Sequence, residues 1–424
     1  MTFNARLLIA YCFITVSLTT ACSSTTTNAA LNNESTNNNI ATEYTTFEDD
    51  KREVFFAGIS YLGEASKLKQ RYPHVLALNT FSEKRPSVDR LLEEFITVNT
   101  YPHLQLNNGL ANLKDGESIV VSLAIELERV IIEEIRSGQK LYFEVGAQLM
   151  FMDFETMSLI TSYPVRVTKN VIKPVGQDLS QVIDDNFKSL YLGSPIKANA
   201  QINKLTPEAS IQQGSSGGLL NRTIEVLKQV QLLDTAPLRF QVDSLELTDS
   251  VRTKLPPETQ FEDIEHYLAQ HFTRNFAQTY EVNALPFSKG HTVGNKMMGQ
   301  FANGDIYQLD IPESDYTFDM KVLDIKKVTK GAHILFASRL SFALTHTASE
   351  QTEIAGKFHY SVPKFKNYKS MDETSAYEDA TEELFLDIIE QLSKPSKEWH
   401  KRHSNNHKKS YQEFKQVQEL LNYD

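Results

Sequence analysis

The chain has 424 residues, which is enough for two domains of ordinary size or for one large one. Hydrophobic residues make up 41% and charged residues 23% of the sequence, so most of the chain is expected to fold around packed cores. The formal net charge of -11 argues against nucleic acid, or an anionic lipid surface, as the main partner.

Both cysteines of the chain, Cys12 and Cys22, lie close to its N-terminus. The residues that follow contain none. A structural disulfide, a thiolate metal site and a catalytic cysteine are therefore excluded from the part that is expected to fold.

Residues 1–21 are predicted to be a signal peptide. One charged residue, Arg6, precedes an apolar stretch over 7–16, and small polar residues follow up to Ala21. The apolar stretch is shorter than the roughly 20 residues that a membrane-spanning helix needs. The segment "LTTAC" resembles the signal of bacterial lipoproteins, although Thr19 stands where that pattern usually has Leu.

This resemblance implies that Cys22 carries lipid, such as palmitate, and is the first residue of the mature chain. Ser23 after the cysteine implies sorting to the outer membrane in species that follow this rule. The alternative is an ordinary secretory signal that is cut near Ala21, with Cys22 incidental. The mature chain has no apolar run of about 18 residues or more, so lipid on Cys22 is expected to be its only membrane anchor.

Residues 22–51 are predicted to be a flexible tether. The segment is rich in Ser, Thr and Asn, and it has no periodic apolar residues with which to form a core. As a flexible coil its ends would lie roughly 30 Å apart on average. The folded part can therefore stand clear of the membrane and remain attached to it.

Residues 52–202 are predicted to form a first α+β module. An apolar, strand-like run covers residues 54–63, and Val88, Leu91, Leu92 and Phe95 have the spacing of a helix. Three strands with alternating apolar residues follow over 118–127, 141–151 and 158–169, which predicts an antiparallel meander. A helix over 178–191 is expected to cover one face of this sheet.

Residues 203–235 are interpreted as a linker and a short helix, and residues 236–395 as a second module. A strand at 238–249, a long helix at 259–280 and a short strand at 282–287 open this module. Three long strands follow at 316–325, 332–345 and 354–362, and a helix at 375–392 closes it. Ser375 and Glu378 have the spacing of a capping box at the start of that helix. Residues 396–424 are predicted to be a basic helical tail.

The predicted fold class is α+β, with two tandem modules that each have a mixed, mainly antiparallel sheet and helices on one face. Both halves read as strand, helix, strand, meander and closing helix. A duplication, or chance recurrence of a common layout, explains this order. The order resembles the α+β modules of envelope lipoproteins such as the curli-secretion channel subunit and the lipoprotein activators of penicillin-binding proteins. That resemblance implies a module that binds other proteins and performs no chemistry.

A glycine-rich stretch at 287–305 is the first candidate for partner contact. Glycine amides can hold a phosphate and lysines can add charge, but neither GxGxxG nor GxxxxGK[ST] is present. The simpler interpretation is a long loop between strands, which is a common place for a binding surface. The candidate contact residues are Lys289, Gly290, His291, Gly294, Lys296 and Gly299.

Other patterns give weaker indications of chemistry. His400, His403 and His407 have helical spacing that could suit zinc, yet a solvated basic segment is the simpler interpretation. The segment "GSSGG" lacks the preceding strand that a serine nucleophile needs and is interpreted as a linker. Acidic pairs such as Glu133 and Glu134 are scattered. No enzyme, cofactor or metal site is therefore predicted.

The sequence favours a non-enzymatic envelope lipoprotein that binds envelope proteins or peptidoglycan and is held to a membrane through lipid on Cys22. The first alternative is a subunit of an oligomeric outer-membrane export or surface-assembly complex. Glutamates such as Glu126 and Glu144 weigh against strands that face lipid over their whole length. A small-ligand receptor or a hydrolase is a third alternative. The sequence predicts no nucleic-acid partner and leaves the oligomeric state open.

Overall fold

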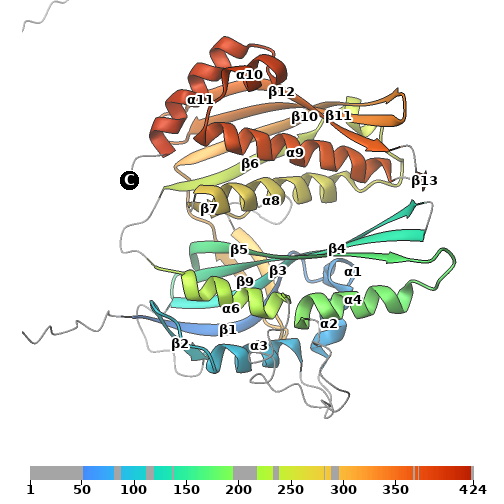
Figure 1. The fold of residues 1–424 in the computed structure, drawn as a ribbon. Helices are drawn as coiled ribbons and strands as arrows, with labels where there is room; N and C mark the ends of the chain where they lie inside the picture. Colours follow the sequence, from blue (N-terminus) through green and yellow to red (C-terminus); the bar gives the residue numbers. More distant parts are fainter. Residues whose placement is uncertain are drawn as a thin grey trace, which may run out of the picture. The chain divides into compact units, whose positions relative to one another are not determined.

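The structure is a computed structural model, which describes residues 51–80, 87–110, 119–135, 138–193, 217–232, 238–280, 282–287, 296–365, 368–370 and 372–421. The chain from Asp49 onward forms one compact unit. Its described elements are helices and two mixed sheets (Figure 1). The predicted α+β fold class with two modules is confirmed. Among the described residues, no helix is both long and apolar enough to cross a membrane.

The first sheet has eight strands in the order β13-β3-β4-β5-β9-β8-β1-β2. They are β1 (Arg52–Leu62), β2 (Leu104–Asn108), β3 (Ile119–Ile135), β4 (Gly138–Asp153), β5 (Ser158–Lys173), β8 (Lys296–Phe301), β9 (Ile306–Asp310) and β13 (Tyr368–Ser370). β1 also pairs with β3, so six of the strands form a closed cycle of pairings. Alternation places Leu141, Phe143 and Val145 in the core on one face of β4.

Helices cover that apolar face of the first sheet. They are α1 (Leu68–Arg71), α2 (Pro73–Asn79), α3 (Val88–Thr97), α4 (Ser180–Leu192) and α6 (Leu219–Gln229). The Ser87 hydroxyl accepts a hydrogen bond from the Arg90 amide and so starts α3. Phe187 of α4 meets Phe143 of β4 edge to face, with ring centroids 5.5 Å apart. The core predicted from the apolar periodicity is therefore present on this side.

The second sheet has five strands in the order β12-β11-β10-β6-β7. They are β6 (Arg239–Leu247), β7 (Asn283–Leu285), β10 (Tyr316–Lys330), β11 (His333–His346) and β12 (Gln351–Phe365). Its helices are α7 (Asp249–Arg252), α8 (Phe261–Tyr280), α9 (Glu373–Ser393), α10 (Lys397–His403) and α11 (His407–Leu421). Phe272 of α8 lies in an aromatic core with Phe318 and Phe342 of the sheet.

The two sheets repeat one pairing scheme. In the first, β1 runs parallel to both β2 and β3, and β3, β4 and β5 pair antiparallel. In the second, β6 runs parallel to both β7 and β10, and β10, β11 and β12 pair antiparallel. The similarity predicted from element order therefore extends to strand order and direction. This agreement favours duplication over chance recurrence.

A hairpin inside the second half of the chain pairs with the first sheet. The long loop predicted over 287–305 is wrong from Lys296 onward, because β8 and β9 pair with each other, with β1 and with β5. Gly299 interrupts the alternating pattern of β8, so this strand was not recognised in the sequence. A Cβ there would lie 2.4 Å from the Tyr307 ring, so the glycine makes room for a buried tyrosine. β13 also lies within 236–395 and pairs with β3 of the first sheet.

The C-terminal tail packs on the second sheet instead of remaining solvated. His400 has no exposed surface, and its Nδ1 lies 2.8 Å from the Ser410 hydroxyl oxygen of α11. Phe414 is buried with it. Helix periodicity in 410–421 indicated this packing, whereas the many Lys and Arg residues concealed the apolar stripe.

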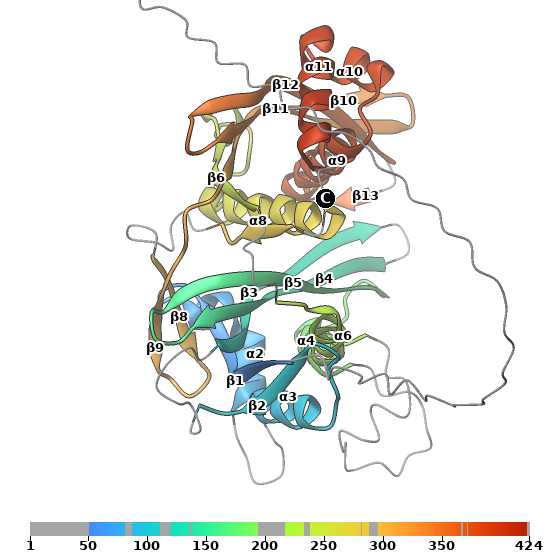
Figure 2. The same cartoon turned by 90° about the vertical axis from the view of Figure 1, so that its left-hand side faces the viewer.

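Helices α8 and α9 form a layer between the two sheets (Figures 1 and 2). One side of this layer packs in the second-module core. The other side meets the first sheet through polar contacts, such as that between Gln270 of α8 and Glu126 of β3. The first sheet is therefore covered on both faces, and the two coverings differ in chemistry.

Candidate functional site

The structure describes two of the predicted site residues. Lys296 is exposed on β8, and its Nζ lies 3.4 Å from the Asp310 carboxylate on β9. Gly299 lies on the same strand beside Tyr307. These two residues are parts of a hairpin instead of a loop. The remaining predicted site residues lie outside the described part of the chain: Cys22, Lys289, Gly290, His291 and Gly294.

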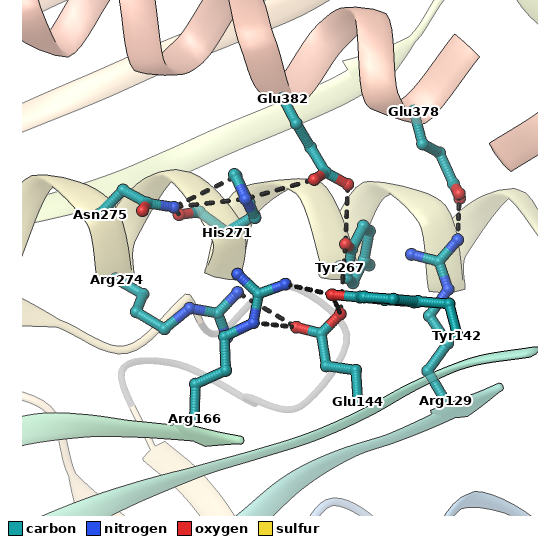
Figure 3. Close-up of polar contacts among 10 residues, drawn as sticks. All are labelled: Arg129, Tyr142, Glu144, Arg166, Tyr267, His271, Arg274, Asn275, Glu378 and Glu382. Carbon is teal, nitrogen blue, oxygen red and sulfur yellow. Dashed lines mark hydrogen bonds and ion pairs between the residues drawn. The ribbon is translucent and has the colours of Figure 1, made fainter. Parts of the chain in front are cut away.

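A layer of buried and partly buried polar side chains lies between the first sheet and helices α8 and α9, and Figure 3 shows its central part. It is called the charged layer below. Strands β3, β4 and β5 supply one side and the two helices supply the other. Its members are Glu126, Arg129, Tyr142, Glu144, Gln148, Arg166, Tyr267, Gln270, His271, Arg274, Glu378 and Glu382.

Glu144 of β4 is the centre of the charged layer and has no exposed surface. Its Oε1 lies 2.8 Å from Nε of Arg166 on β5 and 3.4 Å from a guanidinium nitrogen of Arg274 on α8. The hydroxyls of Tyr142 and Tyr267 lie 3.3 and 3.5 Å from its other oxygen. A buried carboxylate needs such partners because burial removes its hydration. Glu144 therefore binds the two modules together.

Tyr267 continues these contacts into α9. Its hydroxyl donates to the Glu382 carboxylate at 2.7 Å, and Nε2 of His271 lies 3.3 Å from the other Glu382 oxygen. Burial lowers the pKa of His271 well below its usual value, and the positive charges of Arg274 and Arg166 lower it further. His271 is therefore a neutral imidazole, held by the carboxylate without carrying charge.

Arg129 of β3 joins the same layer at its other end. Its guanidinium lies 4.0 Å from the centroid of the Tyr267 ring and pairs with Glu378 of α9. Burial raises the pKa of Glu378 to about 7, although Arg129 opposes the shift. The predicted capping role of Glu378 is wrong, because Asp372 caps α9 by accepting a hydrogen bond from the Ser375 amide. Glu378 is instead a contact between modules.

A bulge in β3 directs these side chains. The strand register shifts between Ile125 and Leu127. Ile125 belongs to the apolar core beneath the first helices, whereas Leu127 packs against the core of the second module. Both are odd-numbered residues, so the bulge has reversed the faces of the residues that follow. It thereby turns Arg129 toward α8 and α9.

Glu126 lies at the bulge, opposite Gly146 of β4. Its Oε2 accepts hydrogen bonds from the side-chain amides of Gln148 and Gln270, at 2.7 and 2.9 Å. A Cβ at Gly146 would lie 3.2 Å from the Cβ of Leu127, closer than usual, so the glycine eases the close pairing of β3 and β4 at the bulge. Burial raises the pKa of Glu126 to about 7. This carboxyl can therefore exchange a proton near neutral pH.

Glu128 points to the opposite face and holds helix α2. It accepts hydrogen bonds from the amides of His74 and Val75, at 3.0 and 2.7 Å, and from the Tyr191 hydroxyl at 2.7 Å. A carboxylate at a helix N-terminus satisfies amides that have no partner within the helix. Burial nevertheless raises the pKa of Glu128 to about 7.

Two clefts border the charged layer, and both have Arg129 and Tyr267 in their lining. The larger has a volume of about 470 Å³ and is also lined by Lys67, Arg71 and Glu126. The smaller has a volume of about 270 Å³ and is lined by residues such as Lys140, Lys364 and Asp379. Since both signs of charge line each cleft, either suits a ligand or chain segment that carries both. In the described part of the chain, no group of three or more His, Cys, Asp or Glu side chains could hold a metal ion.

A partial signal for the charged layer is present in the sequence. Glu126, Glu128 and Glu144 interrupt strands that are otherwise apolar, and such positions predict buried partners. The partners were not predictable, because Arg129 and Glu378 lie 249 positions apart in the chain. The outer face of a predicted strand gives no indication of which remote helix will cover it.

No protein-family model and no curated protein matches the chain. Among solved structures, a Xanthomonas campestris protein assigned to DUF330 is 13% identical, with a TM-score of 0.23, and the match covers 37% of this chain and 82% of that one. A hypothetical protein from Chlamydia trachomatis is 6% identical, with a TM-score of 0.23 and coverages of 36% and 96%. A minor lipoprotein from Acinetobacter baumannii is 14% identical, with a TM-score of 0.19 and coverages of 35% and 90%.

Proposed function

We propose that this chain is an envelope lipoprotein that acts by binding, without catalysis, and that lipid on Cys22 holds it at the outer membrane. The observation that carries the proposal is the position of Cys22. It follows a charged, apolar and small-residue segment, precedes a Ser/Thr/Asn-rich tether, and is the last cysteine of the chain. The partner is an envelope protein or peptidoglycan.

The architecture supports a binding role because the two modules are tied into one body. The chain passes from the second module into the first sheet at β8 and β9, and again at β13. The charged layer adds buried contacts such as those of Glu144. A partner therefore meets a fixed arrangement of surfaces, and binding to it involves little loss of conformational freedom.

The buried carboxylates also fit a binding protein. Glu144, Glu378 and Glu382 each contact side chains on another element. These contacts stabilise the interface between the modules, and that is a sufficient reason for burying the three glutamates. A catalytic role is not needed to explain their burial.

The test is a Cys22→Ala variant expressed in the natural host. We expect the wild-type protein to fractionate with membranes and to carry acyl chains on its N-terminal residue by mass spectrometry. The variant should lose the acyl chains and leave the membrane fraction. A wild-type protein with a free N-terminal residue, or one confined to the cytosol, would contradict the proposal. Partners that copurify with the wild type and are lost with the variant would identify the binding role.

A second candidate is a subunit of an export or surface assembly, and one observation favours it. At the far end of β3 and β5, Ile132 is 38% exposed and Ile172 is 63% exposed, and Val175 beyond β5 is 56% exposed. Exposed apolar side chains at the end of long strands suit contact with another subunit. A mature chain that elutes as a monomer in size-exclusion chromatography would count against this candidate.

A further inference from the structure

The C-terminal helices concentrate positive charge in a chain that is acidic overall. Residues 394–409 contain six Lys or Arg residues and one Glu, whereas the net charge of the chain is -11. These cationic residues are exposed on α10, on α11 and beside them, and they are called the basic corner below: Lys394, Lys397, Lys401, Arg402, Lys408 and Lys409.

The basic corner is held on a rigid base. The Ser396 side chain caps α10 by accepting a hydrogen bond from the Trp399 amide at 3.3 Å. The Trp399 indole donates to the Asp387 carboxylate of α9 at 2.8 Å. His400 is buried against Ser410, as described above. Because these contacts fix both helices, the cations keep their spacing without losing backbone freedom on binding.

The basic corner continues onto the edge of β12. The Asn405 amide donates to the Lys357 carbonyl oxygen at 3.2 Å, and Ser404 forms a bridge with Phe358. Lys357 and Arg339 are exposed beside this edge, and Arg339 pairs in register with His359, whose pKa is lowered by burial and by the nearby His403 and Arg339. The tail therefore covers the middle of the strand edge and extends its positive surface.

The position of the basic corner is informative. The helices α10 and α11 lie on the second sheet, whereas β1, the first described strand after Cys22 in the chain, lies in the first sheet (Figures 1 and 2). β1 and these two helices lie on opposite sides of the layer that α8 and α9 form. An anchor at Cys22 does not occupy the basic corner, so this surface is available to a partner other than the anchoring membrane.

We propose that the basic corner binds the carboxylates of peptidoglycan stem peptides. This inference rests on the proposed envelope location and names the partner for one surface of the protein. Stem peptides present carboxylates repeatedly along a polymer. Single exposed ion pairs contribute little, but several cations on a fixed surface bind such a polymer multivalently. An anionic lipid surface is the competing partner, and in that case the basic corner would have to face a membrane.

The experiment uses the mature chain from residue 22 onward with Cys22→Ser, so that no lipid contributes. The protein is sedimented with purified peptidoglycan sacculi at low ionic strength. The test variant combines Lys401→Glu, Arg402→Glu, Lys408→Glu and Lys409→Glu. The matched control reverses the same number of exposed lysines elsewhere: Lys51→Glu, Lys69→Glu, Lys188→Glu and Lys228→Glu.

We expect the test variant to bind sacculi at least about fivefold less than the wild type, and the control to bind within about twofold of it. Binding should disappear at 1 M salt, where the screening length falls to about 3 Å. Sacculi whose carboxyl groups have been converted to amides should not bind the wild type. Far-ultraviolet circular dichroism should be the same for all variants, because the substituted side chains are exposed.

Three results would overturn the inference: equal binding by the test variant and the wild type, equal binding to amidated sacculi, or preferential binding to phosphatidylglycerol vesicles. None of these depends on acylation of Cys22. The lipoprotein proposal is tested separately by the N-terminal analysis of the natural protein, so the two can fail independently.

Discussion

The first and second sheets share a strand order, yet they differ in what covers the face turned away from their own helices. On the first sheet, Glu144 lies on that face and is fully buried by α8. On the second sheet, Lys321 of β10 and Glu246 of β6 form an ion pair whose side chains are 52% and 41% exposed. Charged residues on a sheet face therefore remain solvated or require buried partners, and the partners here join the modules.

The largest effect is expected from Glu144→Ala. The substitution leaves Arg274, which is buried, and Arg166, which is partly buried, without their carboxylate. The free energy of unfolding should fall by about 3–5 kcal/mol, measured by chemical denaturation. Lys321→Ala on the second sheet is the matched control and should change it by less than about 1 kcal/mol. Similar decreases in the free energy of unfolding for the two variants would contradict the contrast between a buried and a solvated charged face.

Glu126→Gln should show how burial of a carboxyl affects stability as pH changes. Burial raises the pKa of Glu126 to about 7, so between about pH 4.5 and 7 the folded chain binds a proton that the unfolded chain does not. That contribution is present at low pH and is lost as pH rises through 7. Relative to the wild type, the variant should be more stable at pH 8 than at pH 5 by about 2–3 kcal/mol.

The groups that face Glu126 are Gln148, Gln270, Arg274 and Glu144, and they are unchanged in the variant. Denaturation curves of both proteins at the two pH values give the difference directly. A difference that does not change with pH would show that Glu126 is ionised in the folded protein throughout this range.

His400→Gln should give the opposite pH dependence in the second module. Burial lowers the pKa of His400 to about 4, so between about pH 4 and 6.5 the unfolded chain binds a proton that the folded chain does not. The wild type therefore loses stability as pH falls through 6.5. Relative to the wild type, the variant should be more stable at pH 5 than at pH 7.5 by about 2 kcal/mol.

The same denaturation measurements test this prediction, and the two variants act as controls for each other. A pH dependence of the same sign in both would contradict the assignment of a buried carboxyl to one module and a buried neutral imidazole to the other. The His400 imidazole is surrounded by the rings of Phe358, Trp399 and Phe414, and Ser410 is its hydrogen-bond partner.

The smallest effect is expected from Gly299→Ala, which tests the hairpin that distinguishes the first sheet from the second. A Cβ at this position would lie 2.4 Å from the Tyr307 ring and would displace it. The free energy of unfolding should fall by about 1–2 kcal/mol. Hydrogen exchange should increase in β8 and β9 before it increases in β3 and β4. Unchanged hydrogen exchange in β8 and β9 would show that Tyr307 can move aside without destabilising the hairpin.

Much of the fold was predictable because its signals are local. Alternating residues such as Leu141, Phe143 and Val145 indicated the strand β4, and the stripe that includes Phe272 and Phe276 indicated the helix α8. The strand β8 was not predicted, because Gly299, which makes room for a tyrosine ring, was interpreted as a loop residue. The burial of His400 was not predicted either, because the many lysines around it in the sequence indicated a solvated segment.

The long strands of the two meanders, most helices and the repeated order of elements could be predicted from local sequence, because each depends on residues that are close together in the chain, and the lipidation of Cys22 is a prediction of the same local kind. That β8, β9 and β13 join the first sheet became visible in the three-dimensional structure alone. It also decided which glutamates meet which arginines. Those pairings are set by burial, which brings together groups from distant parts of the chain and requires each charge to find a partner there.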